Sequence, residues 1–382
     1  MQNYSVLANG GTPKTRFNKN VIFCFGASIS RKPNFFEIFM KPSADTFAVS
    51  NLKTKNMKTK VILAGLLACI GITAQAQDTK TEEPKGKAIV QVFGNFHTGF
   101  GAENDDRGFE LERSYFGYEY NFGNGLSAKA VMDIGKSSSV DDYQRIAYIK
   151  NAMVSWKRGG LTLNGGLIST TQFNFQEKFW GYRYIMKSFQ DQYKFGSSAD
   201  LGISVAYKFA DWLSADAIIV NGEGYKKIQV NDGLNYGLGV TLTPVKGFQI
   251  RLYGGLNESG EEGKKDIANL AAFVGYKHDK FSVGAEYNQM WNASYKDDAD
   301  QYGYSVFASV KVAKFADLYA RYDDLYSNND WNIAKDEAAA ILGAQFKLGK
   351  YVKIAPNFRM SIPKADGAKN GYYAYINCYF GF

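Results

Sequence analysis

The segment Ser169–Asp200 combines basic side chains with regularly spaced apolar ones. Its large apolar residues follow one another at intervals of four, three, four, three and four, the spacing of one helical face, and they are Phe175, Phe179, Tyr182, Met186, Phe189 and Tyr193. Basic residues lie between them, namely Lys178, Arg183, Lys187 and Lys194. Fixed ammonium and guanidinium groups attract anions. The segment therefore predicts a helical surface that is apolar on one side and attractive to anions on the other.

Residues that could carry other chemistry are few. His97 and His278 are the only histidines, and neither has a Ser or Cys partner at a nucleophile-motif spacing. Cys378 is the only cysteine after residue 76, so neither a disulfide within that part nor a cysteine metal cluster is expected. Acidic runs near Asp105 and Asp297 could bind divalent cations, but solvated loops commonly carry such runs. We expect no catalytic residue, no metal and no cofactor.

The sequence on both sides of this basic segment has a hydrophobic period of two. From Ile89 onward apolar and polar residues alternate, and every second residue from Tyr372 to Phe382 is apolar. Such alternation predicts strands with one apolar face. The alternating stretches run for roughly ten residues, which is the length that crosses a bilayer with tilt, whereas strands of soluble proteins average about 5–6 residues. We therefore expect strands whose apolar faces meet lipid.

If the apolar faces meet lipid, charged residues on the opposite faces line an interior channel. Nine of these are basic, and they are Arg113, Lys129, Lys208, Arg251, Lys311, Arg321, Lys347, Lys353 and Arg359. Five are acidic, and they are Glu119, Asp133, Asp216, Glu286 and Asp317. A surplus of one sign biases ion permeation. Pairing of opposite charges across the wall is the alternative, and it would cancel that bias.

Short and long links alternate between the strands. Seven are short turns, such as Gly123–Gly125, Lys246-Gly247 and Gly349-Lys350, and eight are long, so they join sixteen strands. Outer-membrane barrels combine an even strand number, short periplasmic turns and longer external loops. The pattern predicts an all-β fold, a 16-stranded antiparallel transmembrane β-barrel spanning 88–382 and wide enough for an aqueous channel.

Ser169–Asp200 is the third long link and much the longest. Its aromatic stripe needs an apolar partner, which water outside the barrel does not offer. The inner wall near Phe307 and Tyr319 could supply one. We therefore expect the third external loop to fold inward and to set the narrowest point of the pore. A helical cap outside the barrel is the alternative.

A secretory signal peptide is expected over residues 57–76. Met57 starts a short basic stretch, Val61–Ile72 is apolar, and Ala74-Gln75-Ala76 forms a small-residue cleavage site ahead of Gln77. A lipoprotein box ending at Cys69 is the alternative. Residues 77–87 form a short periplasmic lead-in, and residues 1–56 are expected to be a non-native or disordered extension rather than a separate module.

The charge balance of the chain depends on this division. The full sequence carries a formal net charge of +8 at pH 7. Residues 1–76 hold ten of the 45 basic and two of the 37 acidic residues, so 35 of each remain beyond residue 76. A neutral barrel gives no electrostatic support for nucleic-acid binding.

Part of the sequence resembles a known group of proteins. The segment F-W-G-Y-R-Y-I-M-K-S-F-Q-D-Q-Y-K-F (Phe179–Phe195), with S-S-A-D-L-G (Ser197–Gly202) and N-G-E-G (Asn221–Gly224), resembles Bacteroidetes outer-membrane porins related to the phosphate-selective porin O/P family. The resemblance covers roughly Ala88–Phe382 and implies sixteen-stranded trimers with an inward third loop. The last residue, Phe382, resembles the terminal aromatic residue that the barrel-assembly machinery reads. A full ladder of arginines or lysines cannot be matched onto this sequence.

These patterns predict a porin in the outer membrane of a Gram-negative bacterium. It would let small hydrophilic solutes diffuse passively, with a weak preference for anions. The expected partners are outer-membrane lipid and lipopolysaccharide, small hydrophilic or anionic solutes, further copies of the chain in a homotrimer, and the barrel-assembly machinery. The alternatives are a structural or adhesive barrel and an outer-membrane hydrolase, and we expect no enzymatic activity.

Overall fold

The computed structural model describes residues 84–101, 104–137 and 144–382. The predicted extension 1–56, the predicted signal peptide 57–76 and the first part of the predicted lead-in lie outside the described residues. The first strand begins at Lys85, three residues before the predicted start of the barrel. Lys85–Lys87 therefore belong to the strand and not to the lead-in.

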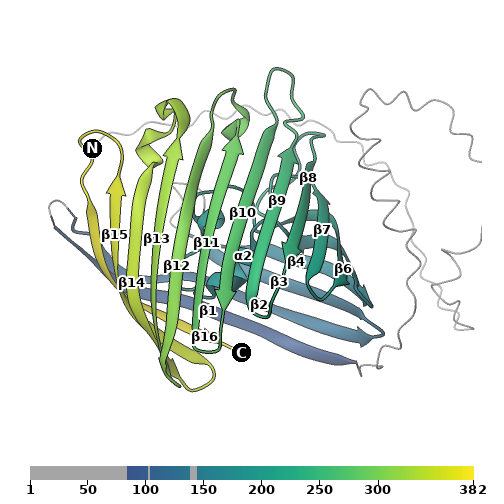
Figure 1. Ribbon diagram of the computed structural model, residues 1–382, viewed down its shortest axis with the longest axis horizontal. Coiled ribbons are helices and arrows are strands. Elements are labelled where there is room, and N and C mark those ends of the chain that lie inside the picture. Colours follow the sequence, from purple (N-terminus) through teal and green to yellow (C-terminus); the bar gives the residue numbers. More distant parts are fainter. Residues whose placement is uncertain (1–83, 102–103, 138–143) are drawn as a thin grey trace, which may run out of the picture. The chain divides into compact units, whose positions relative to one another are not determined.

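Sixteen strands form one closed sheet, in which each strand pairs with its neighbours in the sequence and β1 pairs with β16 (Figure 1). Every pairing is antiparallel. The strands are β1 Lys85–Phe100, β2 Arg107–Gly123, β3 Leu126–Lys136, β4 Arg145–Arg158, β5 Leu161–Ser169, β6 Ala199–Ala210, β7 Leu213–Val220, β8 Asn235–Leu242, β9 Phe248–Asn257, β10 Ile267–Lys277, β11 Phe281–Trp291, β12 Gln301–Ala313, β13 Ala316–Ser327, β14 Glu337–Leu348, β15 Val352–Pro363 and β16 Gly371–Gly381. The sixteen-stranded antiparallel barrel predicted from the alternating links is confirmed.

The links alternate between short and long as expected. Short turns join β2 to β3, β4 to β5, and so on to the turn between β14 and β15, while the long links gather at the opposite end of the strands (Figure 1). Two of the long links carry single-turn helices, η1 Ala293–Tyr295 in one and η2 Asn328–Asp330 with η3 Ile333–Lys335 in another. No helix among the described residues is long and apolar enough to cross a membrane.

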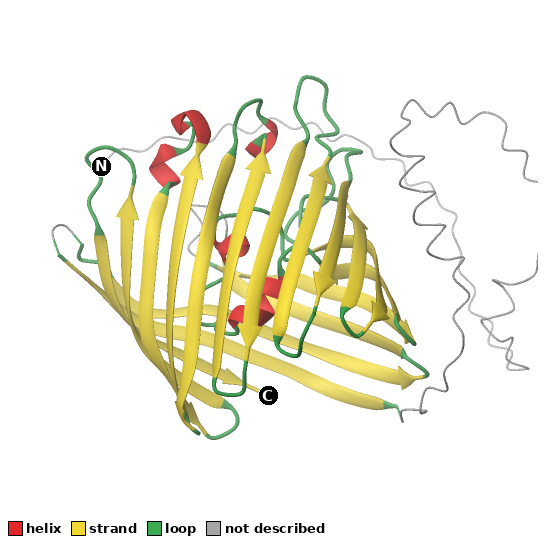
Figure 2. Ribbon diagram, viewed as in Figure 1, coloured by secondary structure: helices red, strands yellow, loops and turns green. Residues whose placement is uncertain are grey.

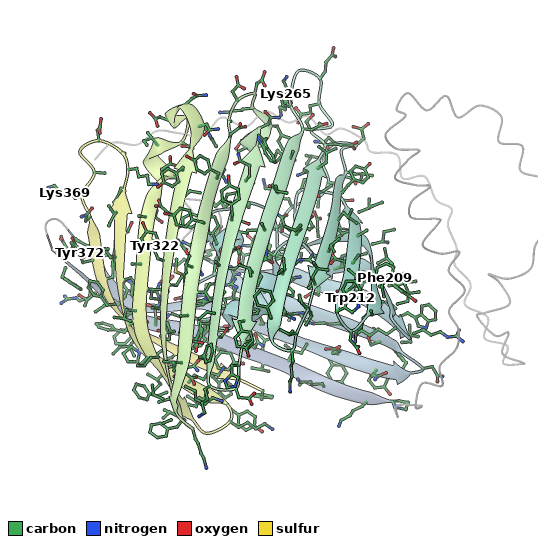
Figure 3. The ribbon with its side chains drawn as sticks, in the orientation of Figure 1. Phe209, Trp212, Lys265, Tyr322, Lys369 and Tyr372 are labelled. Atoms are coloured by element: carbon green, nitrogen blue, oxygen red, sulfur yellow. The ribbon has the colours of Figure 1, made fainter. Side chains whose placement is uncertain are left out.

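Apolar side chains cover the outer face of the sheet. Exposed large apolar residues recur at every second position, for example Val306, Val310 and Val312 in β12, while Phe307 between them is buried inside. Aromatic residues mark strand ends, and Figure 3 labels Phe209 and Trp212 beside a short turn and Tyr322 and Tyr372 nearer the long links. A lipid-facing apolar band with aromatic flanks is typical of membrane barrels.

Besides register shifts next to three short turns, two β-bulges within the strands break the period of two. In β2, Phe93 of β1 pairs with Arg113 and Gly94 pairs with Leu111, so Glu112 is the extra residue. In β4, Val131 and Met132 of β3 pair with Asn151 and Ile149, so Lys150 is extra. A bulge bends the strand and redirects a side chain. Here each bulge adds a charged residue to the interior, since Glu112 accepts hydrogen bonds from two buried inner asparagines and Lys150 contacts the inward ring of Tyr115.

The link between β5 and β6 lies inside the barrel. It holds two short helices, α2 Asn174–Trp180 and α3 Phe189–Gln192, which Figure 2 shows in red among the strands. The single helix predicted from the aromatic spacing is wrong. Gly181 ends α2 in a left-handed conformation with φ of 76°, its N–H bonded to the Glu177 carbonyl. Glycine adopts this conformation at little cost.

Candidate functional site

Backbone carbonyls of the inward link, 170–198, are held by side chains from widely separated strands. Arg251 of β9 donates to the Thr171 carbonyl at 2.8 Å, Arg321 of β13 to Lys187 at 2.5 Å, and Arg359 of β15 to Ile185 at 2.8 Å. These three arginines were predicted as lumen-lining charges. They do lie on the inner face, but part of each guanidinium anchors the link.

Aromatic packing holds the same link against the inner wall. The ring centroids of Phe179 and Phe273 lie 4.9 Å apart, those of Trp180 and Phe307 5.2 Å, and those of Tyr182 and Tyr319 4.8 Å. Phe307 and Tyr319 are the wall residues that the sequence suggested as partners. Burial of such rings contributes hydrophobic stabilisation that a link in water outside the barrel would lack.

A cavity of about 490 Å³ lies between the inward link and strands β1, β2, β14, β15 and β16, and we call it the charged cavity. Four basic and three acidic residues line it, namely Arg113, Arg183, Lys187 and Arg359 with Glu110, Glu112 and Glu337. Its charged groups thus come from both the link and the wall. Basic residues outnumber acidic ones by one among these lining residues.

Arg183 and Lys187 are the basic residues of the link that line the charged cavity. The Arg183 guanidinium is itself paired, with Nε 2.9 Å from Glu177 and Nη2 3.1 Å from Asp191. Burial is the largest influence on Lys187 and lowers the pKa of its ammonium below the ordinary lysine value. Lys187 therefore loses its charge at a lower pH than an exposed lysine does.

The other two predicted basic residues of the link lie elsewhere. Lys178 lines a hollow with Lys208 and Arg251 on the side of the short turns. Lys194, whose backbone has φ of 61°, lines a different cavity beside the strands β6–β12. The four basic residues of the link thus do not face a single channel axis.

Several predicted lumen charges are paired on the inner wall. Arg113 lies 3.3 Å from Asp133, Arg251 lies 2.6 Å from Asp216, and Lys347 lies 2.8 Å from Asp317. The sequence left two alternatives, a surplus of basic charge in the lumen and pairing of opposite charges along its wall. These ion pairs support the second alternative.

Four predicted lysines lie near the short-turn ends of their strands. Lys311 donates to the Asp279 carbonyl in the neighbouring turn at 2.9 Å. The Lys353 ammonium lies 4.9 Å from the centre of the Tyr379 ring. Lys129 lies opposite Glu119 in the pairing of β2 with β3. Lys347 lies one residue before the end of β14. They surround the end of the barrel away from the long links.

Among the charged residues at or near the charged cavity, the sequence did not predict Glu110, Glu112 and Glu337, which line it, or Lys150 and Lys226 nearby. Glu112 and Lys150 are bulge residues, and Lys226 belongs to the link after β7. Lys150 lies 4.8 Å from the ring centre of Tyr115, and Lys226 lies 4.9 Å from that of Tyr148. A change of phase in the alternation was the available signal for the bulges, because apolar positions are odd at Phe109 and Leu111 but even from Phe116 onward.

The predicted assembly signal, Phe382, closes the barrel at its last residue. Its backbone N–H donates to the Val90 carbonyl at 3.0 Å and its carbonyl accepts from the Val90 N–H at 3.2 Å. The ring is exposed on the outer face beside Phe380. Among the described residues there is no group of three or more His, Cys, Asp or Glu side chains that could hold a metal.

Comparison with known proteins shows similarity in fold. No protein-family model and no curated protein matches the sequence. The outer membrane channel DcaP of Acinetobacter baumannii superposes with a TM-score of 0.58 at 11% identity, covering 80% of this chain and 100% of that one. The anion-selective porin from Comamonas acidovorans gives 0.57 at 12% identity, covering 78% and 100%. In-vitro folded OmpT of Vibrio cholerae, in its trimer form, gives 0.52 at 15% identity, covering 79% and 100%.

The fold is therefore that of outer-membrane porins and channels. A closed barrel leaves no sheet edge unpaired, which is why barrels can span a bilayer. The apolar outer face places this barrel in a membrane, and barrels of this kind reside in the outer membrane of Gram-negative bacteria.

Proposed function

We propose that the chain is a passive outer-membrane porin whose lumen admits small hydrophilic solutes and weakly prefers anions. The observation that carries the proposal is the charged cavity, since it lies inside a closed transmembrane barrel, beside a link that fills part of the lumen. Barrels of sixteen strands enclose a water-filled lumen that is wide enough for small polar solutes. A local surplus of basic groups biases passage toward anions.

The inward link would set the narrowest point of this channel. Its position is fixed by the three arginine-to-carbonyl hydrogen bonds and by ring packing against β10, β12 and β13. Such anchoring favours a constant opening over a gate that swings.

Planar-bilayer recording tests the proposal. Purified protein should give discrete, ohmic conductance steps, and a salt gradient should give a reversal potential on the anion side of zero. A folded barrel that gives no conductance steps would favour a structural or adhesive role instead. A folded, conducting channel with a cation-side reversal potential would remove the anion preference alone.

A homotrimer is part of the proposal. The outer face of β1, β2 and β16 carries an apolar hollow of about 640 Å³ lined by Phe96, Phe109, Leu111 and Ile376. Phe109 is 89% exposed there, and exposed apolar patches mark contact sites for protein or lipid. The trimer form of the OmpT neighbour supports this assembly. Native mass measurement in mild detergent should show three copies, whereas monomer alone would contradict it.

The remaining partners follow from this location. Lipid and lipopolysaccharide would contact the outer face, and the barrel-assembly machinery would read Phe382. The resemblance of Phe179–Phe195 to phosphate-selective porins of the O/P family supports a relation to that family. The anions admitted could therefore include phosphate, which current measurements with phosphate as the only anion would establish.

A further inference from the structure

A second cavity, of about 450 Å³, lies on the opposite side of the inward link from the charged cavity. Its walls are the ends of β6–β12 toward the long links, and its inner side is formed by Tyr193–Ser197. Small-molecule sites commonly measure about 300–1,000 Å³. Six amide side chains line it, and they are Gln172, Asn235, Asn257, Asn269, Gln301 and Asn332. We call it the amide cavity.

The amide groups leave hydrogen-bonding capacity unused. Asn257 is 8% exposed and donates to the Tyr295 hydroxyl at 3.0 Å, yet its Oδ1 has no hydrogen-bond partner among the described residues. The Oδ1 of Asn269 is likewise without a partner in that part of the chain. A buried polar atom left unpaired costs free energy. Both oxygens are shielded from solvent, so a ligand that donates hydrogen bonds would satisfy them once the carboxamides turn toward the cavity.

The acidic residues of this cavity are already engaged by the backbone. The Asp200 carboxylate accepts N–H groups from Leu201 at 2.8 Å, Gly222 at 2.7 Å and Gly224 at 3.1 Å. Glu223 accepts the Val230 N–H at 3.2 Å. The lysines at the rim, among them Lys194 and Lys335, are exposed to solvent. The inner surface therefore offers neutral donors and acceptors more than charge.

Aromatic rings border the same space. The Trp331 indole N–H donates to the Asp300 carbonyl at 2.7 Å, and the Tyr193 hydroxyl donates to Glu337 at 3.2 Å. Both polar groups are thus occupied, so what the rings offer the cavity is apolar surface. Apolar C–H surfaces pack on such rings.

We propose that the amide cavity binds a neutral saccharide of one or two sugar units. Each sugar hydroxyl both donates and accepts, as does each carboxamide, and the sugar's C–H face matches the aromatic border. An inorganic anion would find few unshielded cations inside, and a hydrocarbon would leave the amides unpaired. The proposal rests on the proposed function, because the saccharide reaches the cavity as a solute entering the lumen.

Channel block in planar bilayers tests the site, with maltose as probe and gluconate as a charged comparison. Maltose added on the side of the long links should reduce the open-channel current in a saturable way. Asn269→Leu, which removes a half-buried amide, and Asn332→Leu, nearer the rim, should each weaken the block by about tenfold. Gln192→Leu is the matched control, because Gln192 is an amide that lines the charged cavity and not the amide cavity. Maltose should block this variant as strongly as it blocks the unaltered protein.

The outcomes separate this site from the porin proposal. Conducting channels that maltose does not block, together with no heat of maltose binding in detergent calorimetry, would overturn the saccharide site and leave the porin intact. Loss of block in Gln192→Leu as well as Asn269→Leu, or tighter binding of gluconate than maltose, would also overturn it. Absence of conductance with maltose binding retained would instead remove the porin function.

Discussion

Arg321 and Asp323 lie two residues apart on the inner face of β13 and form a bidentate ion pair, with Nε 2.7 Å from Oδ1 and Nη2 2.5 Å from Oδ2. Both side chains are almost completely buried, and the remaining Nη1 donates to the Lys187 carbonyl. One guanidinium thus joins the barrel wall to the inward link. Asp323 orients the guanidinium that holds the link.

Replacing Arg321 by Met should destabilise the barrel by about 3–5 kcal/mol, because a buried carboxylate loses its counter-ion. Thermal unfolding followed by circular dichroism would measure the change. The released Lys187 carbonyl should also make single-channel currents noisier. The double variant Arg321→Met with Asp323→Leu should recover most of the stability but not the quiet current. A quiet current restored together with the stability would show that Arg321 does not position the link.

Removing residues 174–195 and joining the ends with a short Gly-Ser linker should raise conductance. The ends already lie together, since the Thr170 N–H donates to the Ser198 carbonyl at 3.2 Å and the Thr170 hydroxyl donates to Ser197. The deletion exposes Phe273, Phe307 and Tyr319 to water, so some loss of stability is expected as well. Unchanged conductance in a barrel that still folds would mean that this link does not form the constriction.

The strands could be predicted from the sequence because lipid outside and water inside impose one alternation on every strand. The turn between β8 and β9 shows the limit of that signal. The sequence suggested Lys246-Gly247 as the turn, whereas β8 already ends at Leu242 and the link runs to residue 247. Residues near a strand end can continue the ladder of backbone hydrogen bonds or leave it at a similar cost in free energy. The alternation of apolar and polar residues therefore does not show where the strand ends.

The site was harder to predict because it depends on contacts between distant residues. Alternation places Arg251, Arg321 and Arg359 on the inner face, but nothing local to them shows that they bind carbonyls of the inward link. The bulges at Glu112 and Lys150 move two charges to the interior against the simple period. Gly181 divides the aromatic stripe between separate helices, so the aromatic residues pack on several sides instead of one.

Changing Lys187 to Glu should move the reversal potential toward cation preference. Lys187 lines the charged cavity and has no ion-pair partner within 4.0 Å among the described residues. Lys194→Glu is the matched control, because it makes the same charge change in the same link but lines the amide cavity. Its shift should be smaller at equal salt.

Arg183 should not be included in such a reversal. A glutamate there would face Glu177 and Asp191 at short range, and like charges in that position would disturb the link itself. Equal shifts from Lys187→Glu and Lys194→Glu would indicate that the charged cavity is not the selective part of the pore.

Asp324 of β13 should be the residue whose loss most destabilises the outer end of the barrel. Its carboxylate accepts the hydroxyls of Tyr304 at 3.0 Å, Tyr322 at 3.1 Å and Tyr326 at 3.0 Å, and the Lys364 ammonium at 2.5 Å. The residue is only 5% exposed although it belongs to the outward-facing series that includes Tyr322. A charge facing lipid is tolerated when every lone pair is occupied.

Asp324→Leu leaves one ammonium and three hydroxyls without their acceptor, so we expect a loss of about 2–4 kcal/mol in the free energy of unfolding. Asp324→Asn retains one acceptor oxygen and should lose roughly half as much. Asp366→Asn, in the exposed link after β15, makes the same chemical change outside this cluster and should alter stability by less than about 0.5 kcal/mol. Urea unfolding in lipid vesicles measures all three variants. If Asp324→Leu were as stable as the Asp366 variant, the four donors must find water or lipid acceptors, and the cluster would not anchor this end of the barrel.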